Sequence, residues 1–344
     1  MSYLSKADTV YRYLIRRLFW IVPVLFLISG ITFVMMKLTP GGPFEVSSSG
    51  RELPKELQES LERRYHLHEP EWKQYLIYMG VLPTANDAQG RPIFKGVLQG
   101  DLGPSYQYKG RSVTEILFEV PPNRPWWESR FGRSAQLGLF GFLLGALIGI
   151  PLGVVAALNH NRLVDYASLF GATVFVSTPS FVLAIFLMIL FGLVLHWLPI
   201  VARTWNAPSA WVLPTFCLGA GLAAFVTRLT RATMLEVLRQ DYIRTARSKG
   251  LRDRIIMLRH ALRNAMIPVA TVLGPALAGL ITGTFFIEYM FSFPGMGRLF
   301  VQSIGQRDYS MIMGTTLFYA FLIALANLTV DLIYAWLDPR ISYS

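Results

Sequence analysis

Long uncharged stretches recur along the chain. Breaking the sequence at every Asp, Glu, Lys and Arg leaves six windows of at least 19 residues, at 18–36, 134–161, 166–202, 204–227, 264–287 and 309–330. A helix needs about 20 residues to cross the ~30 Å hydrocarbon core of a bilayer. The windows are continuous rather than alternating in polarity, which favours helices over a membrane β-barrel. The pattern predicts an all-α polytopic membrane protein with six transmembrane helices.

Two of the windows allow a second interpretation. The window 18–36 follows a basic N-terminus, as a secretory signal would, but it is long and leads into Thr39–Pro43 instead of a small-residue cleavage site. We expect it to remain as a membrane anchor. The window 166–202 is long enough for two helices, yet Pro179 and Pro199 favour one kinked helix followed by a short irregular exit.

The charge distribution orients the chain. Only 15% of the 344 residues are charged, against about 25% in an average soluble domain. Residues 228–263 hold ten Lys or Arg and three acidic residues, and four more basic residues precede the first window. Basic residues stay on the cytoplasmic side, so both termini and this loop are expected there. The net charge of +11 is explained by this topology, and we expect no nucleic-acid partner.

These assignments divide the chain into four regions. Residues 1–37 form a cytoplasmic N-terminus and the first helix, and 38–133 form an extracytoplasmic domain. Residues 134–338 form a five-helix core that contains the cytoplasmic loop 228–264, and 339–344 form a cytoplasmic tail.

A stripe of glycines marks the second window. These residues follow one another at intervals of four: Gly141, Gly145, Gly149 and Gly153. Small residues at this spacing let two helix backbones approach closely, and no hydrophobic force holds helices together in lipid. We expect the stripe to serve helix packing, with a gating role as the alternative.

The basic loop contains a candidate docking helix. Asp241 is a good N-cap and Gly250 a good C-terminal stop, which leaves about two turns of helix over Tyr242–Lys249. An isolated helix this short is marginal in water and needs a partner. Thr245 and Ala246 would permit close approach of that partner. The alternative is a solvated loop that only sets the topology.

The same loop carries a family resemblance. Arg244–Gly250 and Arg259–Pro268 resemble the cytoplasmic signature loop of ABC-importer permeases. Arg244 and Thr245 stand where the general form has Glu and Ala, as in the dipeptide/oligopeptide/nickel branch. Further stretches in the same order resemble that branch: Leu38–Pro43, Gly100–Ser105, Gly149–Gly153, Phe293–Gly297, Arg307–Tyr309 and Asp331–Arg340. Residues 81–97 and 121–134 depart from it, because both look longer than the usual form.

The resemblance implies a specific machine. The fold would be that of a type I ABC-importer permease in a prokaryotic inner membrane. Two permeases would pair, two cytoplasmic ATPases would bind their loops, and an extracytoplasmic binding protein would deliver di- or oligopeptides. Nickel or another small solute is the alternative cargo. The ATPase-coupling residues would be Asp241, Tyr242, Arg244, Thr245, Ala246, Gly250 and His260.

Catalytic motifs do not occur in the sequence. The dipeptide Gly-Lys of a phosphate-binding loop is absent, so we expect no enzyme activity and no cofactor here, with ATP and Mg²⁺ bound by partner ATPases. His66 and His68, with Glu69 nearby, could bind a metal, but two ligands on a loop are more typical of a surface, and no metal site is assigned. Polar residues in spans are pathway candidates, with a structural role as the alternative: Glu288, Asn327 and Asp331.

Two other classes of protein remain in competition. A secondary transporter would work without ATP, but such proteins often show inverted repeats and broken helices, and neither is evident in the sequence. A receptor would use its helices only as anchors. Copurification with two ATPases would separate both from an importer subunit.

Overall fold

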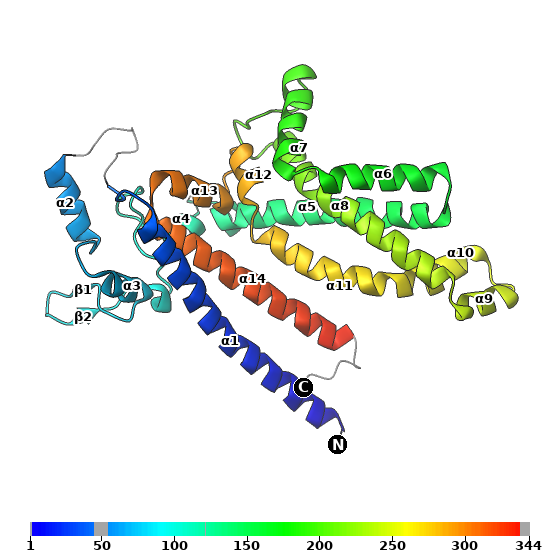
Figure 1. The fold of residues 1–344 in the computed structure, drawn as a ribbon, viewed down its shortest axis with the longest axis horizontal. Coiled ribbons are helices and arrows are strands. Elements are labelled where there is room, and N and C mark those ends of the chain that lie inside the picture. The colour runs from blue at the N-terminus through cyan, green and yellow to red at the C-terminus, as the bar shows by residue number, and fades with distance from the viewer. Residues whose placement is uncertain (1, 45–53, 121, 338–344) are drawn as a thin grey trace. The chain divides into compact units, whose positions relative to one another are not determined.

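The computed structural model describes residues 2–44, 54–120 and 122–337, and their side chains from 15 to 329 within those ranges. The described chain divides into two units (Figure 1). The first combines the N-terminal part up to Arg133 with Pro294–Leu328, and the second is built mainly from Ser134–Phe293.

Helices dominate both units. The first holds α1 (Ser2–Leu38), α2 (Lys55–Arg64), α3 (Glu71–Met79), α4 (Val113–Phe118), α13 (Met296–Gln306) and most of α14 (Tyr309–Leu337), with 3₁₀ turns at Val97–Gln99 and Trp126–Glu128. A two-stranded antiparallel hairpin pairs β1 (Ala85–Asn86) with β2 (Pro92–Ile93). The second holds α5 (Arg130–Leu158), α6 (Leu163–Ser177), α7 (Ser180–Leu187), α8 (Pro208–Leu238), α9 (Asp241–Ser248), α10 (Asp253–Ile255), α11 (Leu262–Ile281) and α12 (Phe285–Met290). Two π-helical segments, Met188–Val194 and Ile256–Ala261, extend α7 and join α10 to α11.

The membrane-spanning helices follow the uncharged windows. Within the described residues, five helical segments are long and apolar enough to cross a bilayer, or six if the bent pair α6 and α7 forms one span. Their lipid-facing character is plain in α1, where large apolar side chains such as Phe19, Leu27 and Leu38 are more than half exposed. The prediction of a mostly helical, multi-spanning protein is confirmed.

The third window differs from its prediction. Instead of one kinked helix, it forms two helices bent by 103° at Thr178 and Pro179. Pro179 is the N-cap of α7, and Thr178 before it takes an extended conformation with φ −87° and ψ 119°. Proline removes an amide donor and disfavours the helical region for the residue that precedes it. The position of the break was therefore readable from the sequence, whereas its angle was not.

The glycine stripe of α5 lies against α8. A Cβ atom placed on Gly141, Gly145, Gly149 or Gly153 would come within 2.6–2.8 Å of atoms in α8. At Gly149 and Gly153 the atoms include the backbone carbonyls of Ala223 and Thr227. Side chains therefore do not separate the two backbones, and α5 and α8 pack as closely as glycine allows.

Residues 54–133 of the first unit, which are predicted to be extracytoplasmic, are tied to the start of α14 by Asp308, which is 1% exposed. Its carboxylate accepts hydrogen bonds from the Ser105 hydroxyl at 2.5 Å and from the backbone amides of Tyr106 and Gln107 at 3.1 and 3.2 Å. The flanking residues donate to the first motif: Arg307 to the carbonyl of Gly42 at 3.3 Å, and Tyr309 to that of Gly41 at 3.2 Å. Three motifs far apart in sequence thus meet at one place.

Candidate functional site

The short helix α9 ends where glycine permits it. Gly250 has φ +76°, its amide donates to the carbonyl of Arg247 at 2.9 Å, and the amide of Leu251 donates to that of Ala246 at 3.3 Å. These two bonds form a Schellman motif, in which a left-handed residue reverses the chain. The C-terminal stop predicted at Gly250 is confirmed.

The start of α9 differs by one residue from its prediction. Gln240, not Asp241, is the N-cap of α9, and Arg252, directly before Asp253, is the N-cap of α10; neither N-cap side chain makes a capping hydrogen bond. Both aspartates instead occupy the first helical position. A carboxylate there still interacts favourably with the partial positive charge of the helix N-terminus.

One face of α9 is buried against its own chain. Ile243 is 0% exposed and Ala246 is 7% exposed, and both pack in one apolar cluster with Ala157 of α5, Met234 of α8 and Ile256. The prediction that Ala246 faces a partner is therefore wrong. Its small side chain lets α9 lie close to α8 and α11, which supplies the support that a two-turn helix requires.

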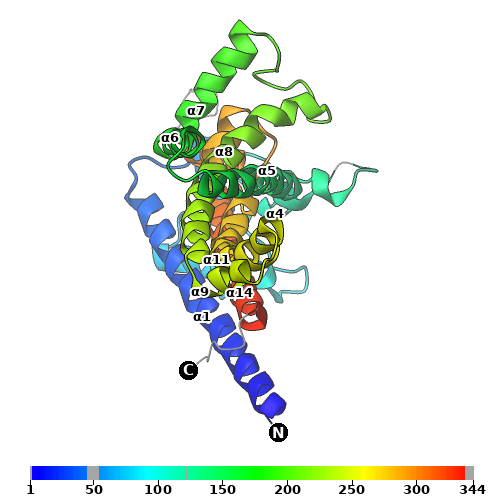
Figure 2. The ribbon, with the colours of Figure 1, turned by 90° about the vertical axis from the view of Figure 1, so that its right-hand side faces the viewer.

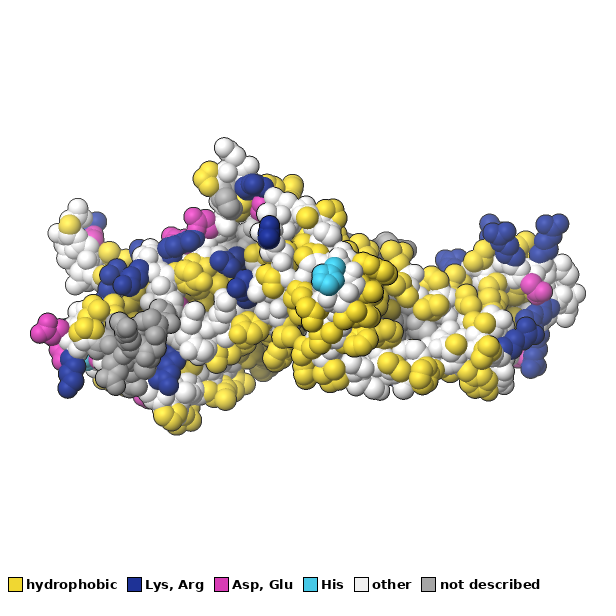
Figure 3. Space-filling model, turned by 90° about the horizontal axis from the view of Figure 1, so that it is seen from above, with side chains coloured by type: hydrophobic (Ala, Val, Ile, Leu, Met, Phe, Trp, Pro, Cys, Tyr) yellow, Lys and Arg dark blue, Asp and Glu magenta, His cyan; other side chains and the backbone are white. Residues whose placement is uncertain are grey.

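The opposite face of α9 is exposed and charged. The exposed positions are Asp241, Tyr242, Arg244, Thr245, Arg247, Ser248 and Lys249. Arg244 lies 3.6 Å from Asp241, and Arg247 lies 3.9 Å from Asp253, in open ion pairs of little energetic weight. Figures 1 and 2 show α9 at the end of α8 and α11, and Figure 3 shows the blue side chains gathered over this end of the unit.

Two further coupling candidates flank this face. The hydroxyl of Tyr242 accepts a hydrogen bond from the side chain of Asn264 at 2.9 Å, which links α9 to the start of α11. His260 lies in the π-helical segment Ile256–Ala261 and is partly exposed. Thr245 donates to the backbone carbonyl of Asp241 at 3.0 Å, so its methyl group is left to the exposed surface.

A buried ion pair between α6 and α8 was missed in the sequence. Asp165 is 0% exposed, and both of its carboxylate oxygens accept from Arg231, at 2.5 and 2.7 Å. The amide of Asn161 donates to the same carboxylate at 2.9 Å, and the His160 ring lies 3.3 Å from it. A signal was present, because Asp165 is the one acidic residue between Glu128 and Glu236.

The pathway candidates lie on two different helices. Glu288 is fully buried in α12, and its carboxylate accepts from the backbone amide of Thr284 at 3.3 Å, which fits a structural role at a helix start. Asn327 is exposed on α14, in the other unit. Asp331 continues α14, but its side chain lies outside those that the structure describes.

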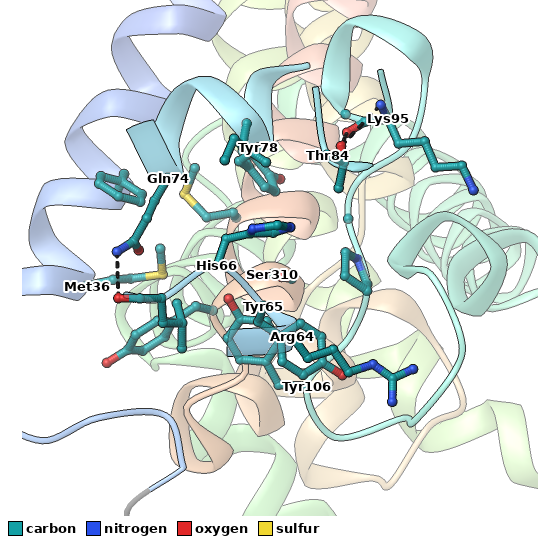
Figure 4. A pocket seen from close by; sticks show the side chains of 18 of the residues that line it. Met36, Arg64, Tyr65, His66, Gln74, Tyr78, Thr84, Lys95, Tyr106 and Ser310 are labelled. Carbon is teal, nitrogen blue, oxygen red and sulfur yellow. Dashed lines mark hydrogen bonds between the residues drawn. The ribbon is translucent and has the colours of Figure 1, made fainter. Parts of the chain in front are cut away.

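The histidines of the α2–α3 turn are also separate. His68 is 3.9 Å from Glu62, whereas His66 lines a cavity (Figure 4). Among the described residues, no group of three His, Cys, Asp or Glu side chains is arranged to hold a metal ion.

Comparisons with known proteins match almost the whole chain. The family described as binding-protein-dependent transport system inner membrane component matches residues 149–343, and its N-terminal counterpart matches residues 10–122. The dipeptide transport system permease protein DppB of Bacillus subtilis is 41% identical over 330 residues, covering 96% of this chain and 97% of the relative. The oligopeptide transport system permease protein OppB of Escherichia coli K12 is 39% identical over 334 residues, covering 96% and 99%.

A solved structure of the MetNI methionine ABC transporter aligns over 61% of this chain and 94% of the matched chain, with 18% identity and a TM-score of 0.47. The family matches and the curated relatives agree, because both identify transport-system membrane components. The chain belongs to the family of binding-protein-dependent transport system inner membrane components, in the branch of the dipeptide and oligopeptide permeases.

Proposed function

We propose that this chain is the permease subunit of an ATP-driven importer and forms half of the pathway for di- or oligopeptides. The observation that carries the proposal is α9. It is a two-turn helix. Its apolar side chains Ile243 and Ala246 pack against other helices of the same chain, and its other face is exposed and basic. Such a face is suited to a cytoplasmic partner of complementary charge.

The partners follow from what the chain lacks. It has no phosphate-binding loop, so two separate ATPase subunits would bind ATP and Mg²⁺ and dock on α9. A second permease would complete the pathway, and an extracytoplasmic binding protein would deliver the peptide. The names of the curated relatives, which are peptide transport permeases, support a peptide cargo.

The charge asymmetry supports an orientation with both termini and α9 in the cytoplasm. Cysteine placed at Asn86, in the outside segment, should react with an impermeant maleimide in intact cells. Cysteine placed at Arg252, next to α9, should react only after permeabilisation. The native Cys217 is buried and supplies a low background. Labelling at position 252 in intact cells would contradict the orientation.

The importer assignment is tested by reconstitution. Proteoliposomes with both permeases, both ATPases and the binding protein should take up labelled peptide only with ATP, whereas this chain alone should neither hydrolyse ATP nor move peptide. Peptide uptake by the chain alone would favour a secondary transporter. Uptake of ⁶³Ni²⁺ in place of peptide would keep the machinery and change the cargo.

The secondary transporter has one observation in its favour. The bent pair α6 and α7 is a broken helix of the kind that such transporters use. A solvent-exposed basic helix fixed against the cytoplasmic ends of three spans has no purpose in that class. An importer subunit therefore explains more of the observed features than a secondary transporter does.

A further inference from the structure

The outside segment of the first unit contains a cavity that the coupling site does not use. Its volume is about 120 Å³. Figure 4 shows it between the outer end of α1, the α2–α3 turn and the start of α14. The lining that carries the argument is Met36, Tyr65, His66, Tyr78, Tyr106 and Ser310.

A buried hydrogen-bonding group in this cavity has no partner. The hydroxyl of Tyr78 is buried and makes no hydrogen bond to any residue that the structure describes. Burial raises the pKa of Tyr78 well above its usual value, so this hydroxyl remains a donor. A buried donor without an acceptor is unfavourable and needs an explanation, and an acceptor on a molecule bound in the cavity would supply one.

His66 provides a second polar group beside it. Figure 4 shows the imidazole next to Tyr78 in the middle of the cavity. The backbone of His66 has φ +59° and closes α2, with the amide of Leu67 donating to the carbonyl of Glu62 at 2.8 Å. Asn tolerates this left-handed conformation better than most residues, so it can replace His66 without opening the turn.

The remaining residues that line the cavity indicate the charge and the shape of a ligand. Its ionisable side chains besides the tyrosines are Lys37, Arg64, His66 and Lys95, and it includes no Asp or Glu. An anionic acceptor is therefore favoured over a cation. Most of the other lining is aromatic or aliphatic, as in Tyr65, Tyr106 and Met36, which suits an apolar body.

We propose that this cavity binds the C-terminal residue of a peptide. The carboxylate accepts from Tyr78 and His66, and one apolar side chain fills the aromatic part. A cavity of about 150 Å³ holds a benzene ring, so the space is suited to one side chain and excludes a whole dipeptide. The assignment rests on the proposed peptide cargo and adds a recognition site outside the membrane.

The test is ligand binding to the full-length chain in lipid nanodiscs, followed by ¹⁹F NMR. The probe is N-acetyl-4-fluorophenylalanine, compared with its C-terminal amide. The carboxylate should bind, and the amide should bind about tenfold more weakly, because hydrogen bonds to charged groups are the stronger ones. Tyr78→Phe should weaken the carboxylate probe by about tenfold, and His66→Asn should weaken it further in combination.

Tyr289→Phe is the matched control, since this tyrosine is 47% exposed on α12, and it should leave binding unchanged. Equal binding of the acid and the amide, or equal binding by wild type and Tyr78→Phe, would overturn the proposal.

Displacement of the probe by decanoate but not by unlabelled peptides would assign the site to a membrane fatty acid. ATP-driven peptide uptake together with absent probe binding would refute the cavity site alone, and probe binding without any peptide uptake would refute the importer alone.

Discussion

Replacing Gly250 with valine should lower ATP-driven uptake by roughly tenfold or more, because a β-branched residue in the left-handed region costs on the order of 1–3 kcal/mol. Gly250 has φ +76°, and a Cβ atom there would meet nothing within 4 Å. Valine would therefore destabilise the left-handed backbone conformation of residue 250, and with it the Schellman motif that ends α9, without any steric clash. Uptake and ATPase stimulation by the loaded binding protein, measured in reconstituted complexes, report the effect.

Gly250→Asn separates this cause from crowding of a partner. Asparagine is larger than glycine but accepts the left-handed conformation, so it should keep most of the uptake. Gly305→Ala is a neutral control, since a Cβ atom at this glycine also meets nothing within 4 Å and its φ is not positive. If valine and asparagine fail equally, the surface around Gly250 is a tight contact and conformation is not the reason.

Breaking the Asp165–Arg231 pair should uncouple the complex. Asp165→Asn leaves a largely buried guanidinium without its counter-charge, and breaking a buried pair in this way costs about 3–5 kcal/mol. Arg231 lies in α8 two turns before that helix ends, and α9 follows directly. We expect a lower melting temperature and, in complexes that still assemble, a loss of the ratio of stimulated to basal ATPase activity.

The control for this pair is Arg228→Ala, one turn earlier on α8 and exposed. It should leave the ATPase ratio near that of wild type. The double exchange Asp165→Arg with Arg231→Asp should restore only part of the ratio, because it keeps the opposite charges but not the bidentate geometry. If Asp165→Asn lowers the melting temperature while the ratio stays unchanged, the pair stabilises the fold without positioning α9.

The sequence predicted what depends on local pattern. Uncharged windows gave the spanning helices, and Gly250 gave the end of α9, because length and backbone conformation are decided within a few residues. The orientation of α9 was misread in one respect. Ala246 is three residues from Ile243 and shares its buried face, whereas its small side chain was predicted to face a partner.

Other features depend on contacts that no local pattern encodes. Asp165 and Arg231 are separated by 66 positions, and Ser105 and Asp308 by 203. The sharp bend before Pro179 depends on how α7 packs against α8 and α12, with Leu183 and Ala184 in the shared core. Each of these needs the fold before its partner can be named.

The junction around Asp308 has a consequence for biosynthesis. At this junction the hydroxyl of Tyr309 donates a hydrogen bond to the carbonyl of Gly41, and the two residues are 268 positions apart. At translation rates of about 5–20 residues per second, the first partner waits roughly 13 to 54 s for the second. Most of the second unit, Ser134–Phe293, is continuous in sequence, so it can form while residues 54–133 still lack their anchor. The first unit is therefore completed after most of the second, and a chain that ends before Asp308 lacks both α14 and the anchor of residues 54–133.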